Sequence, residues 1–141
     1  MSEGFTPAAA RALLLSVGGS EATSSSERIA LAIEQVWVQL AHHFGRLIGA
    51  GGIQALQDRS VSVAAKRLPW LSVPLHGSEV AAWSLVTVFE RRPATEAVAE
   101  LAHVMDSLLT LLGRLIGDAL VETILHEMWP DVFPRRAKEL A

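Results

Sequence analysis

The sequence of 141 residues contains no cysteine and no tyrosine. Without thiols, the chain can form no disulfide, no zinc–thiolate site and no cysteine nucleophile. Aromatic residues make up only 6% of the chain, whereas alanine and leucine are abundant, and this balance favours helices over β-sheet. Half of the residues are hydrophobic and only 19% are charged, so the composition predicts a folded domain rather than a disordered chain.

The sequence also lacks an excess of positive charge and any long uncharged apolar run. Its formal net charge is −3, whereas nucleic-acid-binding proteins collect phosphates on a basic face. A membrane-spanning helix needs about 18–20 consecutive apolar residues. The most apolar stretch, residues 98–121, is interrupted by charged residues, including Glu100, Asp106 and Arg114. The amino-terminal segment lacks the basic start of a secretory signal. We therefore expect a cytoplasmic protein with no membrane span and no nucleic-acid partner.

The pentapeptide Gly-Arg-Leu-Ile-Gly occurs twice, at 45–49 and again 68 residues later at 113–117. Apolar positions before each copy keep the same offset and recur with a helical period. These positions are Ile33, Val36, Trp37, Leu40 and Phe44 in the first copy, and Leu101, Val104, Met105, Leu108 and Leu112 in the second. The pattern predicts an all-α bundle of about five helices, with two long pseudo-repeated helices that face each other about a pseudo-twofold axis. The paired glycines indicate either a kink or a close helix contact.

One helical domain is expected over residues 1–141. Its expected parts are a short amino-terminal helix within 1–19, a polar linker at 20–26, the bundle core at 27–130 and a basic, exposed tail at 131–141. Thr6 followed by Pro7 is typical of a helix start, and Gly18 followed by Gly19 of a helix end.

Within the core, the glycines at 49–52 are expected to weaken the first long helix, which resumes over about 53–66. Residues 68–77 are expected to form an apolar loop. The stretch 78–89 fits either helix or strand, and we expect helix. The second long helix is expected to run unbroken from about residue 93 to Met128.

Five histidines are the first candidates for chemistry. His43 precedes Arg46 by three residues, and this spacing resembles the His-x-x-Lys-Gly neighbourhood of histidine phosphotransfer domains. The resemblance implies a four-helix bundle of comparable size, in which an exposed histidine, here His43, accepts phosphate from an aspartate of a response regulator. Leu47 stands where that family has glycine after the basic residue.

Glu100 and His103 have the spacing with which ferritin-like bundles hold a di-iron centre, but such a centre needs two such pairs. The repeat places Ala32 and Gln35 at the corresponding positions of the first helix, so only half of a site is present. No serine is placed with a general base, and the glycine-rich stretch 49–52 lacks the lysine of a phosphate-binding loop. The sequence therefore predicts no metal, no cofactor and no enzymatic activity.

Four further residues are candidates for binding. Arg46 and Arg114 occupy equivalent positions in the repeat, so they either bind an acidic partner together or pair with nearby carboxylates of the chain. Trp70, in a proline-bounded loop, and Trp129, directly before Pro130, are candidates for exposed anchors, because tryptophan is enriched at binding hot spots.

The sequence as a whole favours a non-catalytic regulatory or adaptor module that acts by protein–protein interaction as a homodimer. The expected partner surface joins the Trp70 loop to the end of the chain from Trp129 to Phe133, with Arg46 and Arg114 as polar contributors. Two alternatives stay open. One is the phosphotransfer protein that uses His43, and the other is a bundle that binds a small apolar ligand between its long helices.

Overall fold

A computed structural model describes residues 5–71 and 89–134 and confirms the all-α fold. These residues form five α-helices and one 3₁₀ turn, and they contain no β-strand. The elements are α1 (Pro7–Gly18), α2 (Ser26–Ile48), α3 (Ala50–Ala64), η1 (Pro69–Leu71), α5 (Ala94–Ile116) and α6 (Asp118–Met128). Nearly all of the 78–89 stretch lies outside the described residues. None of the described helices is both long enough and apolar enough to cross a membrane.

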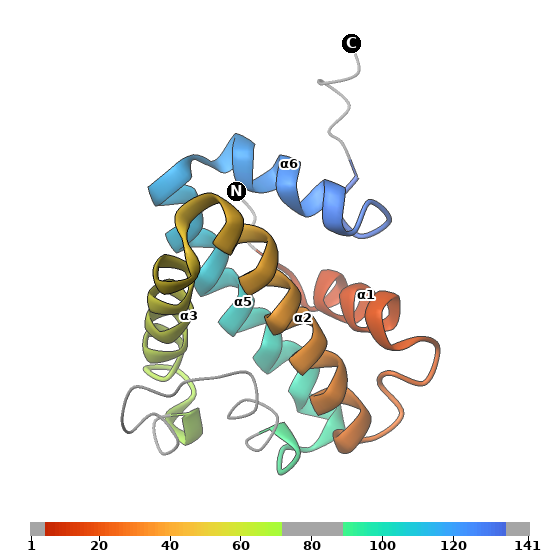
Figure 1. Ribbon diagram of the computed structural model, residues 1–141. Coiled ribbons are helices and arrows are strands. Elements are labelled where there is room, and N and C mark those ends of the chain that lie inside the picture. The colour runs from red at the N-terminus through yellow and green to blue at the C-terminus, as the bar shows by residue number, and fades with distance from the viewer. Residues whose placement is uncertain (1–4, 72–88, 135–141) are drawn as a thin grey trace.

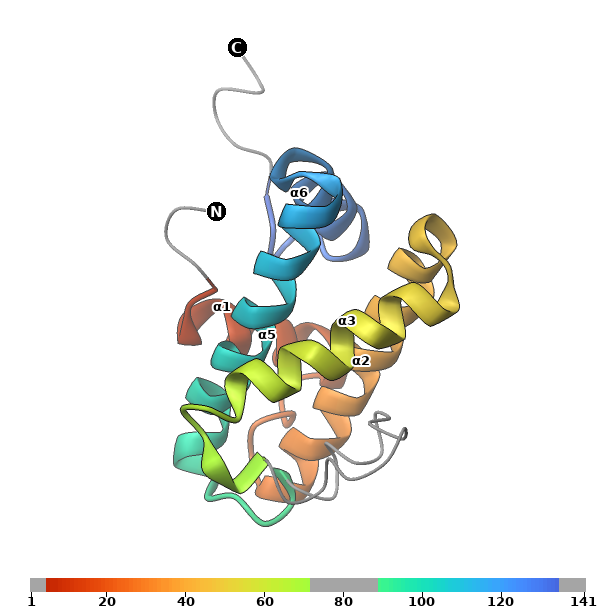
Figure 2. The ribbon, with the colours of Figure 1, turned by 90° about the vertical axis from the view of Figure 1, so that its left-hand side faces the viewer.

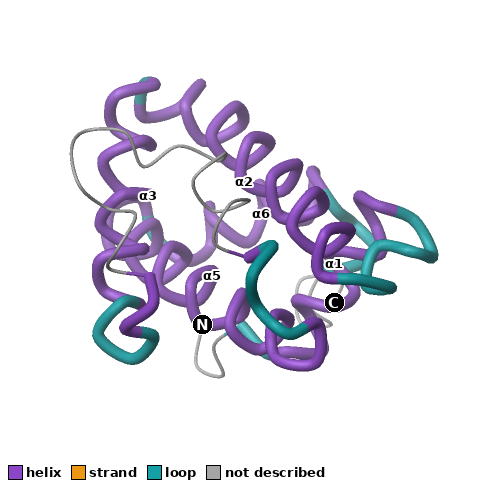
Figure 3. Tube along the Cα trace, turned by 90° about the horizontal axis from the view of Figure 1, so that it is seen from below, coloured by secondary structure: helices purple, strands orange, loops and turns teal. Residues whose placement is uncertain are grey.

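The two long helices form the middle of the molecule and run in the same general direction (Figure 1). Helix α3 packs against both α2 and α5, and α1 packs against the same two helices. Seen from below, α1 and α3 lie on opposite sides of the α2–α5 pair (Figure 3). The fold therefore has three layers, with α2 and α5 between α3 and α1.

Local signals explain where the first helices begin. The Thr6 hydroxyl accepts the main-chain N–H of Ala9, and Ser25 accepts that of Arg28, so each satisfies an amide that the first helical turn leaves free. The apolar stripes of the long helices then form the core. The largest fully buried side chains include Trp37 and Phe44 from α2.

The repeat extends to the helix boundaries. Helices α2 and α5 each contain 23 residues, and each ends directly before a glycine, Gly49 or Gly117, after which the next helix begins immediately. Both glycines have positive φ, 89° at Gly49 and 93° at Gly117. The expectation that the second long helix continues unbroken to Met128 is therefore wrong. It is broken at Gly117, because this backbone conformation is available almost only to glycine and cannot continue a helix.

The first glycine of each pentapeptide gives room to the helix that follows. A Cβ atom at Gly113 would lie 2.1 Å from Oδ1 of Asp118, in the first turn of α6. A Cβ atom at Gly45 would lie 3.4 Å from Cγ2 of Ile53 in α3. The nearest neighbours of both glycines thus belong to the next helix rather than to the opposite long helix. The sequence interpretation left open whether the glycine pairs contact each other, and these neighbours favour a tight helix–glycine–helix corner.

The two corners lead to different packing. After Gly49, α3 turns back along α2 and across α5 (Figure 2). After Gly117, α6 contacts mainly α5 and buries only Val121 and Leu125. Helix α1 occupies the side of the α2–α5 pair opposite to α3, which is where a symmetric α6 would pack. The repeat therefore relates two helix–glycine–helix units, whereas their surroundings differ.

Candidate binding groove between α3 and α5

Helix α5 carries a polar stripe along the face beside α3. Each of its members lies three or four residues from another member, which places them on one side of a helix. They are His103, Asp106, Ser107, Thr110 and Arg114. The buried stripe of the same helix, from Leu101 to Leu112, faces the core. The sequence therefore gives α5 one apolar side that fixes its position and one polar side that stays accessible.

Two adjoining hollows open along this polar stripe. The larger has a volume of about 340 Å³ and lies between α5 and residues Arg59, Val63 and Arg67 of the α3 segment. The smaller, of about 240 Å³, continues past Gly113 to Asp118 at the start of α6. The hollows share Asp106, Thr110 and Arg114, so together they form one groove. We call this the α3–α5 groove.

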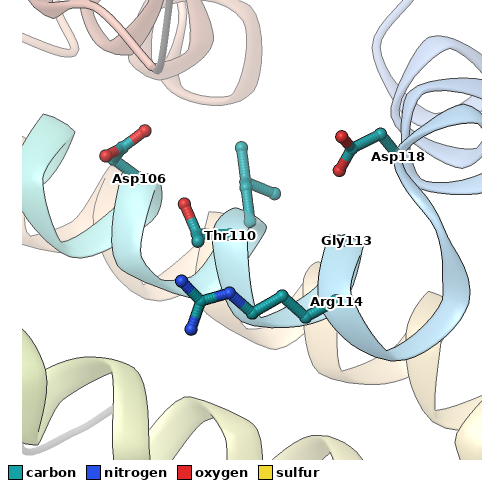
Figure 4. Close-up of a pocket in the computed structure, with 6 residues that line it drawn as sticks. Asp106, Thr110, Gly113, Arg114 and Asp118 are labelled. Carbon is teal, nitrogen blue, oxygen red and sulfur yellow. The ribbon is translucent and has the colours of Figure 1, made fainter. Parts of the chain in front are cut away.

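Both signs of charge line the groove, and its arginines are not paired with the described carboxylates. Arg59, Arg67 and Arg114 are exposed, and none of them has an ion pair with another described residue. The carboxylate of Asp106 accepts the main-chain N–H of Phe5 at 2.9 Å instead of an arginine. Figure 4 shows the Asp106 and Asp118 carboxylates along one edge of the helix and the Arg114 guanidinium on the opposite edge, pointing away from Asp118. The groove therefore presents three arginines that the described residues leave without an ion pair.

Arg46 and Arg114, which were expected to bind a partner together, do not both line the groove. Arg46 is exposed in the last turn of α2, but it lines neither of these hollows. The arginines that line the larger hollow together with Arg114 are Arg59 and Arg67, and the sequence alone did not identify these two as binding residues. Arg59 and Val63 lie four residues apart on one face of α3, and Arg67 follows in the turn after Ala64.

Trp129 is buried and only 5% exposed, so the expectation of an exposed anchor is wrong for this residue. The chain turns back after α6 and brings the Phe133 ring to 6.3 Å from the Trp129 ring. Phe133 in turn stacks on Phe5 at 5.9 Å, and Nδ1 of His126 lies 2.7 Å from the Phe133 carbonyl oxygen. These residues join the amino-terminal segment to the end of α6.

Trp70 is half-buried and held on two sides. Its ring meets the Phe89 ring edge-on at 5.3 Å, and the Arg92 guanidinium lies 4.6 Å above its centre. η1 and the carboxyl-terminal end of α6 lie at opposite ends of the molecule (Figure 1). The Trp70 and Trp129 segments therefore do not form the single surface that the sequence suggested.

His43 is exposed on α2, and its Nδ1 lies 3.0 Å from the Gln39 carbonyl oxygen. When Nδ1 donates this hydrogen bond, Nε2 keeps its lone pair. Phosphate acceptance by His43 stays a prediction that the geometry neither supports further nor excludes. The second alternative, an apolar ligand, finds no support in the two hollows of the groove, because their lining is mainly polar.

Glu100 and His103, whose spacing matched half of a di-metal site, lie in different environments. Glu100 is buried and bound to Arg92, whereas His103 is exposed. Across 5–71 and 89–134, no group of three or more histidine, aspartate or glutamate side chains is placed to hold a metal ion.

Asp58 of α3 provides a pH-dependent prediction. Burial raises the pKa of Asp58 above the ordinary value of 3.8, and its buried Oδ1 has no hydrogen-bond partner. The folded state thus binds this proton more tightly than the unfolded chain, so Asp58 destabilises the fold as pH rises through its folded pKa. We expect Asp58→Asn to raise the free energy of unfolding at pH 7 by about 1 kcal/mol. Urea denaturation should show this gain shrinking as the pH falls from the raised pKa of Asp58 toward the ordinary value of 3.8, below which its pH-dependent part is lost. The exposed control Asp131→Asn should show no gain, and a gain independent of pH would contradict the assignment.

No protein-family model, curated protein or solved structure matches this chain. Its function is therefore inferred from the geometry of the groove itself.

Proposed function

We propose that this protein is a non-catalytic binding module that receives an acidic segment of another protein in the α3–α5 groove. The observation that carries the proposal is the convergence of Arg59, Arg67 and Arg114 on one hollow without ion pairs among the described residues. The net charge of the chain is −3, so this cluster runs against the overall charge. A local positive field of this kind attracts carboxylates and orients their approach.

The rest of the groove suits a polypeptide. Arginine binds carboxylates with two parallel hydrogen bonds, which adds geometric selectivity to the charge. Thr110 offers a hydroxyl group beside the arginines, and Val63 and Leu111 add apolar surface. An elongated groove that combines these groups suits a segment with several side chains better than a single small ion.

The hydroxyl of Ser107 supports the non-catalytic part of the proposal. It donates to the main-chain oxygen of His103 at 3.1 Å, so the hydroxyl is engaged by its own helix backbone. A serine nucleophile would instead need its hydroxyl in contact with a general base such as an imidazole.

The test is binding of a fluorescein-labelled peptide with alternating glutamate and alanine, measured by fluorescence anisotropy. Combined Arg59→Ala, Arg67→Ala and Arg114→Ala should weaken binding at least about tenfold, because each arginine removed is a charge-assisted contact. Added salt should also weaken binding by the unmodified protein.

Two control variants make this experiment specific. Arg11→Ala with Arg28→Ala removes exposed arginines of α1 and α2 that do not line the groove, and it should leave binding unchanged. Arg46→Ala distinguishes the groove from the Arg46–Arg114 pair, because only the pair predicts a loss. Equal binding by the triple variant and the unmodified protein would refute the proposal.

A further inference from the structure

The larger hollow of the α3–α5 groove concentrates positive charge in a small space. Three arginines and one aspartate are the charged residues of its described lining, so this lining carries a net charge of +2 when His103 is neutral. The volume of the hollow is about 340 Å³. Its aspartate, Asp106, accepts the main-chain N–H of Phe5 and forms no ion pair with these arginines. The described part of the chain therefore does not neutralise this positive charge.

The arginines line the hollow from both of its walls. Arg59 belongs to α3 and Arg67 to the turn that follows it, whereas Arg114 lies in the last turn of α5. His103 and Thr110 of α5 line the same hollow and add an imidazole and a hydroxyl group. A ligand group that occupies the hollow therefore meets guanidinium groups from two separate elements of the fold.

A phosphoryl group uses this arrangement more fully than a carboxylate does. A carboxylate has one negative charge and two oxygens, which a single guanidinium satisfies through two parallel hydrogen bonds. A phosphomonoester carries a charge of about −1.5 to −2 at pH 7 and has three acceptor oxygens, so more than one arginine can bind it at once. Its charge also balances the net charge of the hollow. Clusters of arginines recognise phosphorylated segments through this chemistry.

We infer that the acidic partner segment carries a phosphorylated side chain, whose phosphoryl group binds in the larger hollow between Arg59, Arg67 and Arg114. This inference rests on the proposed function and adds the chemical class of the ligand. Phosphorylation of the partner then strengthens the interaction, because the unmodified segment lacks the group that the three arginines share.

The test compares three fluorescein-labelled peptides of alternating glutamate and alanine that differ only at one central position, which holds glutamate, serine or phosphoserine. Fluorescence anisotropy on the unmodified protein measures their affinities. The phosphoserine peptide should bind at least about tenfold more tightly than the glutamate peptide, which corresponds to one additional charge-assisted contact. The serine peptide should bind no more tightly than the glutamate peptide.

Single substitutions locate the phosphoryl group. Arg59→Ala, Arg67→Ala and Arg114→Ala should each reduce the advantage of phosphoserine over glutamate at least about threefold, because each removes one guanidinium that the phosphoryl oxygens share. Lys66→Ala is the matched control. Lys66 is exposed and directly precedes Arg67 but does not line the hollow, so the advantage should remain. Circular dichroism checks that each variant folds, and the peptide comparison on the unmodified protein does not depend on any variant.

The outcomes separate the two proposals. Equal binding of the phosphoserine and glutamate peptides would overturn the phosphoryl site and leave the acidic-segment module standing. An advantage for phosphoserine that persists in all three arginine variants would also overturn it, because the phosphoryl group would then bind elsewhere. Cosedimentation with phosphatidylcholine vesicles that contain phosphatidic acid, without an advantage for phosphoserine, would assign the hollow to a lipid headgroup instead. Absence of binding by every peptide would refute both proposals.

Discussion

Replacing Arg92 with alanine is expected to lower the free energy of unfolding by about 3 kcal/mol. The Arg92 guanidinium donates through Nε to both carboxylate oxygens of Glu100, at 3.0 and 3.1 Å, and through Nη2 to Oε2. Glu100 is only 7% exposed, so loss of the arginine would leave a buried charge without a counterion. The contact of the guanidinium with the Trp70 ring would be lost as well.

Urea denaturation followed by circular dichroism measures this effect, and Glu96 provides the matched control. Arg92 also contacts Glu96 at 3.3 Å, but the Glu96 side chain is 60% exposed. Glu96→Ala should therefore change the free energy of unfolding by less than about 0.5 kcal/mol. A double change to apolar residues, Arg92→Met with Glu100→Leu, should recover much of the lost stability. A loss for Arg92→Ala as small as that for Glu96→Ala would show that the pair is not structural.

The Arg92–Glu100 pair illustrates what local patterns leave undetermined. In the sequence, Arg92 directly precedes the expected start of the second long helix at about residue 93, and the spacing of Glu100 and His103 suggested half of a metal site. Neither observation predicts that Arg92 binds Glu100. The pair forms because the chain before α5 folds back onto its first turns, and the Ser26 hydroxyl also bonds to the Arg92 carbonyl oxygen there. That return is a tertiary contact, so the helical period of α5 cannot reveal it.

The parts of the fold that could be predicted depend on residues close together in the sequence. The caps at Thr6 and Ser25 and the apolar stripes of α2 and α5 each follow from patterns within a few helical turns. The α3–α5 groove does not, because Arg59 and Arg67 meet Arg114 only through the packing of α3 across α5. The burial of Trp129 likewise depends on the turn after α6, which brings Phe133 against its ring.

The formation of a homodimer stays a prediction.

The break at Gly117 could have been predicted from the repeat alone. The glycines at 49–52 were expected to weaken the first long helix, and Gly117 is the counterpart of Gly49 in the second copy. The continuous apolar stripe through Leu120 and Ile124 favoured an unbroken helix instead. In the structure the buried positions shift by one residue after the corner, because Val121 and Leu125 of α6 are buried whereas Leu120 is 39% exposed.

These corners lead to the second large expected effect. Gly49→Ala should destabilise the fold by about 1–3 kcal/mol, because φ of 89° with ψ of 151° is a conformation that residues with a Cβ atom avoid. A Cβ atom at Gly49 would meet nothing within 4 Å, so the cost comes from the backbone and not from a clash. Gly51→Ala is the matched control. Gly51 lies inside α3 with equally open surroundings, so this change should stabilise the protein by up to about 1 kcal/mol.

Gly117→Ala should give a different result, although its backbone angles, 93° and 142°, are nearly the same. Helix α3 is held along its length by α2 and α5, so the corner at Gly49 cannot open without losing that packing. Helix α6 is held mainly by α5 and buries few residues, so it can leave its position and continue α5 as a straight helix. The loss of stability should therefore be smaller than for Gly49→Ala.

Such straightening would carry Trp129 away from the core, and tryptophan fluorescence in a background with Trp37, Trp70 and Trp83 changed to phenylalanine would report it. In that background, Gly117→Ala should shift the emission to longer wavelength and make it accessible to a soluble quencher, whereas Gly49→Ala should not. If Gly117→Ala instead leaves Trp129 protected and costs as much stability as Gly49→Ala, then the corner before α6 is held as firmly as the corner before α3. The difference between the two units would then lie only in their contacts and not in the strength with which each corner is held.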